Sequence, residues 1–350
     1  MTPHAIFQED LDLILRRTEG LWGQFRSARL FITGGTGFVG KWLLESFLYA
    51  NDQLGLDAEA VVLSRNPTAF AIEYPRLANH SAIRMWEGDI RHFVFPPGVF
   101  THVIHGATDV AASVTPLDMF DVAIAGTRRI LDFCREKNVP DLLLISSGAV
   151  YGSQPPELDL IGEEYSGAPM TTLMQSAYGE GKRAAEWLAI AYGASGGAAV
   201  RIARCFAFVG PYLPLDSHFA VANFMDDFLA GRPIKINGDG TAMRSYMYAA
   251  DMAQWLWVIL ARGVPGEAYN VGAEEAISIA DLAQRISASG NNILPVKIAI
   301  RPCNPKLISN RYIPDTRKAR ELLGLDLSIS LGQALSRTLA WIKAGQSVCK

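Results

Sequence analysis

Residues 29–40 read Arg-Leu-Phe-Ile-Thr-Gly-Gly-Thr-Gly-Phe-Val-Gly, a short apolar run that leads directly into closely spaced glycines. The run predicts a buried parallel strand, and the pattern of residues 41–50 predicts a helix after the glycines. Glycines at this junction permit a tight turn and the close approach of a pyrophosphate, whose charge is met by N–H groups at the start of the helix. Glycines also serve ordinary turns, but the strand–loop–helix order favours a dinucleotide site. Its predicted residues are Gly34, Gly37, Phe38, Val39 and Gly40.

The same alternation of apolar runs and helical patterns continues along the chain. Strands are expected at 60–64, 83–86, 102–105, 142–146 and 199–203, and helices at 116–137, 177–193, 219–229, 251–262, 278–289 and 316–323. Strands that alternate with helices indicate βαβ units and a parallel sheet covered on both faces. We therefore predict an α/β fold, a Rossmann-type doubly wound parallel sheet with a smaller C-terminal α+β substrate lobe.

The expected organisation has three parts. Residues 1–27 form an N-terminal helical extension, in which a helix over about 5–27 packs its apolar face, including Leu15 and Trp22, on the body or on a neighbouring subunit. Residues 28–200, with later returning segments, form the dinucleotide-binding domain. Residues 201–345 form most of a substrate-binding lobe interwoven with the first.

Composition excludes several classes of function. The 350 residues carry 32 Lys plus Arg against 35 Asp plus Glu, and this near-balance argues against nucleic acid or an acidic membrane as a partner. No apolar stretch approaches the roughly 18 residues that a membrane span needs. The four cysteines form no CxxC motif or Cys/His cluster, so we expect no metal site and a reducing, cytoplasmic location.

The end of the second predicted strand bears on the choice of cofactor. An NAD site usually has an acid there, whereas this strand ends at Ser64 and Arg65, which suit a 2′-phosphate. We therefore predict NADP in preference to NAD; the alternative is a surface arginine and an NAD site that relies on other contacts. After the third strand, Asp89 and Ile90 are predicted adenine contacts, unless Asp89 is a solvent-facing turn residue.

Tyr178 and Lys182 are four residues apart, which places them on one face of the predicted helix. A nearby ammonium lowers the pKa of a phenol, so that Tyr178 serves as an acid or base near neutral pH. The same lysine is expected to bind the nicotinamide ribose. Ser147, just after the fifth strand, is expected to share the substrate hydroxyl with Tyr178. Such a Tyr–Lys pair alone is common, but the glycine loop upstream makes coincidence a poor explanation.

The motifs TGGTGFVG, SSGAVYG and YGEGK, in this order, resemble the extended short-chain dehydrogenase/reductase family, in its epimerase/dehydratase branch that acts on nucleotide-linked sugars. The resemblance covers roughly residues 28–340. It implies that Arg244, supported by Asp251, and Arg311 bind a substrate diphosphate, and that Asn223 and Phe224 line the nucleotide base. Read without the resemblance, Arg244 and Arg311 are surface ion pairs.

Two departures from the family pattern limit the reaction. The 4,6-dehydratases carry Thr-Asp-Glu where this chain has Ser147, Gly148 and Ala149, and related decarboxylases use a Glu at the last of these positions. Neither Gly nor Ala can move a proton, which disfavours both reactions. The family often has an Asn where Ala207 stands, so the family's substrate orientation transfers less directly.

The remaining groups need only a nicotinamide for hydride transfer at a sugar carbon, with C4 the expected position. An epimerase returns the hydride to the other face of a rotated ketone, whereas a reductase delivers it once from NADPH. The alternatives are a dehydratase-like enzyme with displaced acid and base, a reductase of a non-nucleotide carbonyl, and a dinucleotide-binding protein without turnover. Similar proteins form homodimers, and we expect a four-helix interface built from residues 120–133 and the helix that carries Tyr178.

Overall fold

The computed structural model describes residues 7–108, 114–215, 219–290, 293–300 and 310–348. Its centre is a seven-stranded sheet in the order β11-β6-β5-β4-β1-β2-β3, with every neighbouring pair parallel. The strands are β1 Arg29–Thr33, β2 Glu59–Ser64, β3 Ile83–Glu87, β4 His102–His105, β5 Asp141–Ser147, β6 Ala199–Cys205 and β11 Ala268–Val271. The strand order reverses beside β1, so the glycine loop leaves the sheet at its switch point, where parallel α/β sheets bind ligands.

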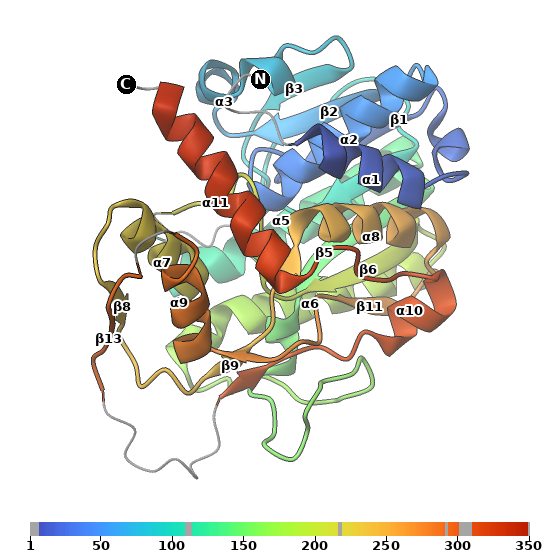
Figure 1. Ribbon diagram of the computed structural model, residues 1–350. Coiled ribbons are helices and arrows are strands. Elements are labelled where there is room, and N and C mark those ends of the chain that lie inside the picture. Colours follow the sequence, from blue (N-terminus) through green and yellow to red (C-terminus); the bar gives the residue numbers. More distant parts are fainter. Residues whose placement is uncertain (1–6, 109–113, 216–218, 291–292, 301–309, 349–350) are drawn as a thin grey trace.

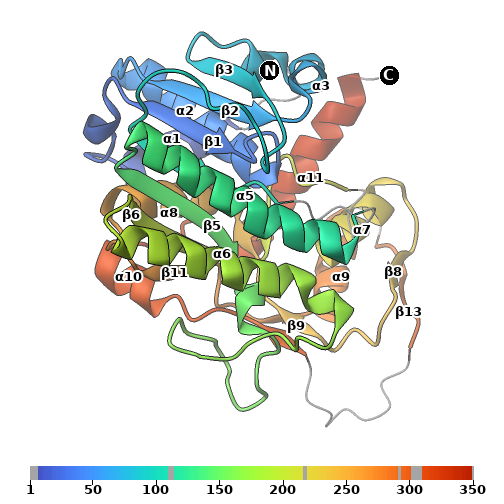
Figure 2. The ribbon, with the colours of Figure 1, turned by 180° about the vertical axis from the view of Figure 1, so that it is seen from behind.

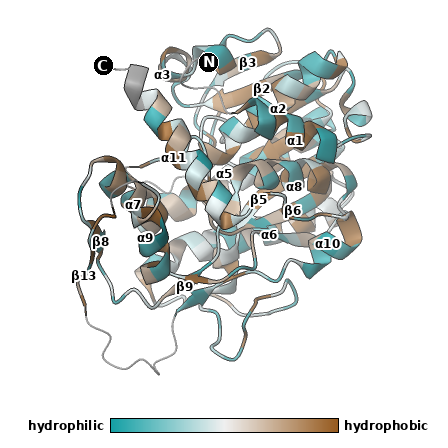
Figure 3. Cartoon of the chain, in the orientation of Figure 1, coloured by the Kyte–Doolittle hydropathy of each residue, from teal (hydrophilic) through white to brown (hydrophobic). Residues whose placement is uncertain are grey.

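Helices cover both faces of this sheet. On one face lie α1 (Gln8–Arg17), α2 (Phe38–Leu54) and α8 (Ala249–Arg262), and on the other lie α5 (Pro116–Lys137) and α6 (Ala177–Ala194) (Figures 1 and 2). Successive strand side chains point to opposite faces. Leu30 and Ile32 accordingly join the core beneath α2 and α8, whereas Phe31 joins the core beneath α5. The sheet is buried on both sides and stands out as apolar in Figure 3.

The C-terminal part adds smaller elements beside the sheet. These are β7 Phe208–Val209, α7 Ala220–Leu229, β8 Ile234–Ile236, β9 Met243–Arg244, β10 Met247–Tyr248, β12 Ile277–Ser278, α9 Ile279–Ser287, β13 Val296–Ile298, β14 Arg311–Tyr312, α10 Arg317–Leu323 and α11 Leu331–Val348. Helices α7 and α9 and strands β8 and β13 project to one side of the main sheet in Figure 1. The predicted fold class, a Rossmann-type sheet with a smaller α+β lobe, is confirmed.

The N-terminal extension packs on the body of the molecule. The predicted single helix is wrong in detail, because α1 ends at Arg17, Gly20 has a φ of 74° that a helix cannot continue through, and a 3₁₀ turn, η1 (Trp22–Phe25), follows. Trp22 is buried 5.1 Å from the Trp257 ring of α8. Asp10 is buried in α1, accepts a hydrogen bond from the Tyr248 hydroxyl at 2.6 Å and forms an ion pair with Arg337 of α11.

Three helices were not predicted from the sequence. Two are the short α3 (Pro67–Glu73) and α4 (Pro75–Ala78), which follow β2. The third is α11, whose apolar residues recur at helical spacing and are buried: Leu331, Ala334, Leu335, Leu339 and Ile342. Across the described ranges, none of the helices combines the length and apolar character needed to cross a membrane.

Candidate active site

At Gly34 and Gly40 the glycine loop between β1 and α2 is packed too tightly for a side chain. Gly34 has a φ of 73°, and a Cβ on it would lie 2.6 Å from the carbonyl carbon of Gly106 at the end of β4. A Cβ on Gly40 would overlap the backbone of Gly34 and Gly35. At Gly37, no side chain in the described part of the chain caps the N-terminal N–H groups of α2. A close backbone cradle below an uncapped helix N-terminus fits the diphosphate of a dinucleotide.

His105 holds the base of this cradle, a role that sequence reasoning missed. Its Nδ1 lies 2.8 Å from Thr33 Oγ1 at the end of β1, and its Nε2 lies 3.1 Å from Thr127 Oγ1 on α5. Thr33 Oγ1 also accepts a hydrogen bond from the N–H of Ala107. Burial lowers the pKa of His105 to about 3, so the ring is neutral and joins two strand ends to a helix. Its signal in the sequence is a polar residue that ends a buried strand.

The end of β2 carries groups of both signs. Ser64 is partly buried and Arg65 is exposed, while Asn66 caps α3 by accepting a hydrogen bond from the N–H of Ala69. Glu87 of β3 pairs in register with Ser64, and this acidic neighbour was not considered from the sequence. The sheet thus places a carboxylate beside the predicted 2′-phosphate position.

The predicted adenine contact, Asp89, is engaged by a neighbouring side chain. Arg91 donates from Nε and Nη2 to its two carboxylate oxygens, each at 2.9 Å. These hydrogen bonds lower the pKa of Asp89 to about 2. Ile90 is buried, 3.0 Å from where a Cβ on Gly126 of α5 would lie. A carboxylate accepts more than two hydrogen bonds, so the adenine contact stays a prediction.

Ser147, Tyr178 and Lys182 meet at the C-terminal end of β5. Helix α6 begins at Ala177, directly after the 3₁₀ turn η3 (Met174–Ser176), and Lys182 Nζ lies 6.0 Å from the centre of the Tyr178 ring. Lys182 Nζ donates to the carbonyl of Ile145 at 2.9 Å. The structure therefore brings together the three residues selected from the sequence, and their catalytic role stays a prediction.

The prediction that Lys182 lowers the pKa of the Tyr178 phenol is wrong for the protein without ligands. Burial raises the pKa of Tyr178 to about 12, because surrounding protein penalises the phenolate, and a hydrogen bond with Ser147 acts in the opposite direction. Burial lowers the pKa of Lys182 to about 8. The phenol is therefore neutral at pH 7 and is a proton donor in this state.

Tyr312, at the end of β14, adds a second phenol that sequence reasoning missed. Its hydroxyl lies 3.5 Å from Ser147 Oγ, across 165 positions of sequence. Its ring lies 4.6 Å from that of Phe206. A Cβ on Gly148 would lie 2.7 Å from the Tyr312 hydroxyl and 2.6 Å from the Phe206 ring, so these two side chains occupy the space beside Gly148.

A buried ion pair braces the helix that carries Tyr178. Glu186, one turn after Lys182, accepts a hydrogen bond from Ser146 at 2.5 Å and pairs with Arg204 of β6 at 2.8 Å. Arg204 also donates to the Tyr151 hydroxyl at 3.0 Å, and Tyr151 donates to Asn270 of β11 at 2.8 Å. The network fixes α6 against strands β5, β6 and β11.

The predicted substrate residues are less clearly assembled. Arg244 lies on β9 beside Tyr312 of β14 and donates to the carbonyls of Met243 and Asn310, at 2.8 and 2.9 Å. Arg311 pairs with Asp159 at 3.3 Å. Within the described residues both arginines thus make local contacts, and a role toward a diphosphate stays a prediction.

Three further predictions from the resemblance fare differently. Asn223 is exposed on α7, whereas Phe224 is buried in the core, which does not fit a contact with a nucleotide base. Asp251 is buried at the start of α8 and accepts hydrogen bonds from the N–H groups of Ser328 and Ile329. Its carboxylate therefore binds this backbone segment and does not support Arg244 as predicted. No group of three or more His, Cys, Asp or Glu in the described ranges is arranged to hold a metal.

Residues 30–272 match the model of the NAD dependent epimerase/dehydratase family. Among curated proteins, the chain is 30% identical over 318 residues to UDP-glucuronic acid decarboxylase 2 of Arabidopsis thaliana, covering 89% of this chain and 67% of the relative. It is 28% identical over 313 residues to UDP-glucuronic acid decarboxylase 3 of the same plant, covering 88% and 86%.

Solved structures share the fold. A dTDP-glucose 4,6-dehydratase from Bacillus anthracis in complex with NAD superimposes with a TM-score of 0.75 at 19% identity, covering 91% of this chain and 98% of that one. A UDP-glucuronic acid 4-epimerase from Bacillus cereus in complex with NAD gives 0.76 at 22% identity, covering 90% and 96%. These similarities concern the fold alone.

Proposed function

Because this chain belongs to the NAD dependent epimerase/dehydratase family, we propose that it transfers a hydride between a nicotinamide cofactor and C4 of the sugar in a nucleotide-diphosphate sugar. The observation that carries the proposal is the meeting of Ser147, Tyr178 and Lys182 at the end of β5, on the sheet edge from which the glycine loop also leaves. The dinucleotide supplies the hydride donor or acceptor when bound.

Each of the three residues has a defined task in this proposal. Tyr178, neutral at pH 7, donates a proton to the carbonyl oxygen during reduction and accepts it during oxidation. Before substrate binds, Ser147 donates its proton to the phenol oxygen, and with a sugar bound the same hydroxyl shares the substrate oxygen with Tyr178. Lys182, whose Nζ donates to the Ile145 carbonyl and lies 6.0 Å from the centre of the Tyr178 ring, would bind the ribose of the dinucleotide.

The surroundings of Gly148 favour hydride transfer over elimination or decarboxylation. In the dehydratases that this chain resembles, the residues at Gly148 and Ala149 are acids. Here Phe206 and Tyr312 fill the space that a side chain at 148 would need. Nearby, the carboxylate of Glu186 is buried and committed to Arg204. The curated decarboxylases are relatives by sequence, and we propose that this chain carries out a different reaction.

Arg244 and Arg311 are the basis for proposing a diphosphate-containing substrate. Arg244 and Tyr312 are register partners on adjacent strands, so Arg244 lies next to the hydroxyl cluster. Partial burial lowers the pKa of Arg244 without removing its charge, and a partly buried guanidinium favours an anion such as a diphosphate. Arg311 is the second proposed diphosphate ligand.

We propose NADP as the preferred cofactor, on the strength of Ser64 and Arg65 at the end of β2. The neighbouring Glu87 acts against a 2′-phosphate, and solved proteins of similar fold contain NAD. The cofactor also separates two reactions. Exchangeable NADPH, consumed in each cycle, indicates a ketosugar reductase, whereas tightly held NAD with no net redox change indicates an epimerase.

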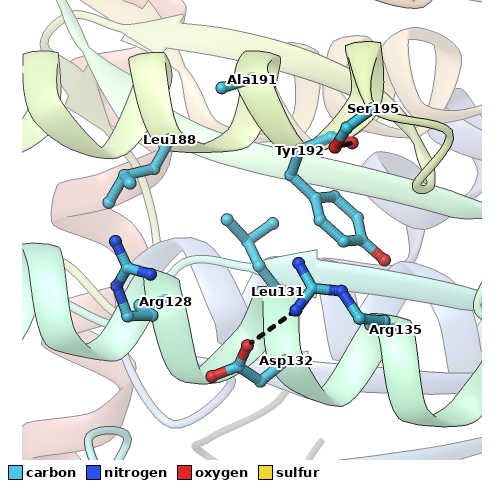
Figure 4. Close-up of a pocket in the computed structure, with 8 residues that line it drawn as sticks. All are labelled: Arg128, Leu131, Asp132, Arg135, Leu188, Ala191, Tyr192 and Ser195. Carbon is cyan, nitrogen blue, oxygen red and sulfur yellow. Dashed lines mark hydrogen bonds and ion pairs between the residues drawn. The ribbon is translucent and has the colours of Figure 1, made fainter.

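We propose a homodimer built on α5 and α6. Figure 4 shows Leu188 and Tyr192 of α6 facing Leu131 of α5 across a groove on the outer side of the two helices. Trp187 of α6 is 69% exposed and Leu117 of α5 is 75% exposed, so each of the two helices presents a large apolar side chain to solvent. A second copy of the same face would cover them in a four-helix interface.

Light scattering at micromolar concentration tests this assembly. We expect a dimer for the wild type and a monomer for Trp187→Glu, because the substitution buries a charge in the interface. Ile72→Glu is the matched control, since Ile72 is 78% exposed on α3, away from α5 and α6. A monomeric wild type contradicts the proposal.

A ligand panel tests the proposed function. UDP-, dTDP-, GDP- and CDP-sugars, each with NAD or NADP, are screened by thermal shift, and stabilising pairs are assayed for turnover. We expect one nucleotide class to raise the melting temperature, and Arg244→Ala to lose that shift while keeping the shift caused by dinucleotide alone. Turnover of a carbonyl without a nucleotide, or dinucleotide binding with no turnover at all, would overturn the proposal.

A further inference from the structure

We propose that Tyr312 is a positioning residue that sets the direction of the Ser147 hydroxyl proton. The proposal rests on the proposed role of Ser147 and Tyr178 and deepens it. Tyr312 arrives from β14, far from both residues in sequence, and its hydroxyl approaches Ser147 Oγ at 3.5 Å. Neither phenol is bonded to the other; each has Ser147 as its hydrogen-bonding partner.

The hydrogen-bonding capacity of Ser147 leads to this role. A serine hydroxyl has two lone pairs and one proton. The N–H of Ala149 donates to Ser147 Oγ at 3.1 Å and takes one lone pair. When the Tyr312 hydroxyl donates to the second, both acceptor positions are filled. The one proton of Ser147 is then left to donate to the Tyr178 oxygen.

The backbone of the Tyr312 segment is held firmly enough for such a task. The N–H of Ile313 donates to the side chain of Gln154 at 2.9 Å, and its carbonyl accepts from the N–H of Ile161 at 3.0 Å. Tyr312 also pairs in register with Arg244 of β9. The Tyr312 ring packs on Phe206 at 4.6 Å. Three separate segments therefore fix the position of the hydroxyl.

The consequence falls on Tyr178. A Ser147 proton directed at the Tyr178 oxygen stabilises the phenolate relative to the phenol, and this hydrogen bond lowers the pKa of Tyr178 against the effect of burial. Without the Tyr312 hydroxyl, the Ser147 proton is free to turn toward other acceptors. Tyr178 then becomes a weaker acid, although Tyr312 makes no direct hydrogen bond with Tyr178 and acts only through Ser147.

The test reads the ionisation of Tyr178 without needing a substrate. A fluorinated tyrosine, which ionises at lower pH than tyrosine, replaces Tyr178 in the full chain, and its ¹⁹F resonance is followed against pH. Four backgrounds are compared: wild type, Tyr312→Phe, Ser147→Ala and the double variant. Phenylalanine retains the ring that packs on Phe206, and Tyr246→Phe is the control, because Tyr246 is a buried tyrosine of the same region.

We expect Tyr312→Phe to raise the pKa at position 178 by about 0.5–1 unit, the size of one hydrogen bond. In the Ser147→Ala background the same substitution has no further effect, because its route to Tyr178 is gone. An equal shift in both backgrounds, or no shift with Ser147 present, overturns the proposal. A merely structural role for Tyr312 predicts no dependence on Ser147.

Turnover provides the second readout. With a nucleotide sugar identified, Tyr312→Phe in the otherwise natural chain should lower kcat about five- to tenfold at unchanged KM. An effect on KM alone would assign Tyr312 to substrate binding and overturn the positioning role. A chain that turns over no nucleotide sugar would overturn the proposed function, while the ¹⁹F titration would still decide the role of Tyr312.

Discussion

The glycine loop and the hydroxyl cluster lie on the same edge of the sheet but are built in different ways. The loop is one contiguous stretch, residues 29–40, and its backbone makes the cradle. The cluster joins Ser147 of β5, Tyr178 of α6 and Tyr312 of β14, and its function depends on where side chains meet. The comparison teaches that a site built from backbone is lost when one atom is added at a close-packed glycine such as Gly40, whereas a site built from side chains can be lost one hydroxyl at a time.

The largest expected effect is therefore that of a single methyl group in the loop. Gly40→Ala should abolish dinucleotide binding and destabilise the protein by several kcal/mol, because the added Cβ would overlap the backbone of Gly34 and Gly35. Gly332→Ala is the matched control, a helical glycine in α11 where a Cβ would meet open space among the described residues. Thermal unfolding and dinucleotide titration measure both. Normal binding by Gly40→Ala would refute the tight-cradle description.

In the hydroxyl cluster, removal of the central phenol should affect chemistry alone. Tyr178→Phe should lower kcat by about two orders of magnitude or more, the usual contribution of general acid–base catalysis, while melting temperature and dinucleotide affinity change little. Steady-state kinetics and calorimetric titration on the same preparation provide the comparison. Turnover like that of the wild type would remove Tyr178 from the mechanism.

Substitutions at the end of β2 test whether side chains there set the preference of the dinucleotide site for NADP or NAD. Arg65→Ala should reduce a preference for NADP over NAD by about ten- to a hundredfold, the value of one charge-assisted hydrogen bond. Glu87→Gln should shift the preference the other way, toward NADP, because Glu87 is the register partner of Ser64. Equal or tighter binding of NAD by the wild type would contradict the NADP proposal and favour an epimerase.

The smallest effect expected is a pH dependence. Burial lowers the pKa of Lys182 to about 8, so its positive charge is present below that pH and is lost as the pH rises through it. Dinucleotide affinity should therefore decline above about pH 8, by a few-fold. Lys182→Met should bind more weakly with no such decline. Lys41→Met should keep the decline, although burial also lowers the pKa of Lys41 to about 8. If the decline in affinity disappears in Lys41→Met and persists in Lys182→Met, the titrating group is Lys41 and the assignment to Lys182 is wrong.

The same contrast explains how much the sequence predicted. The glycine loop, six of the seven strands of the sheet and the Tyr178–Lys182 spacing are local patterns, and they led to the fold and to the family resemblance, both of which are confirmed. The edge strand β11 was not predicted. Tyr312 was missed although its neighbour Arg311 was selected, because only the folded chain brings it to Ser147. The direction of the Tyr178 pKa was also wrong, since spacing along a helix contains no information about burial.

Hydrogen exchange at the sugar tests the central claim most directly. The nucleotide sugar selected by the panel is converted in D₂O, with protium at C4 of an alcohol substrate or on the NADPH for a keto substrate, and the product is examined by NMR. Hydride transfer assisted by Ser147, Tyr178 and Lys182 predicts that the protium passes between C4 and the cofactor, in either direction or out and back, with no solvent deuterium at C4 or C5 and every carbon of the sugar retained. Deuterium at C5, or release of CO₂, would require an acid and base beyond these three residues and would contradict the account.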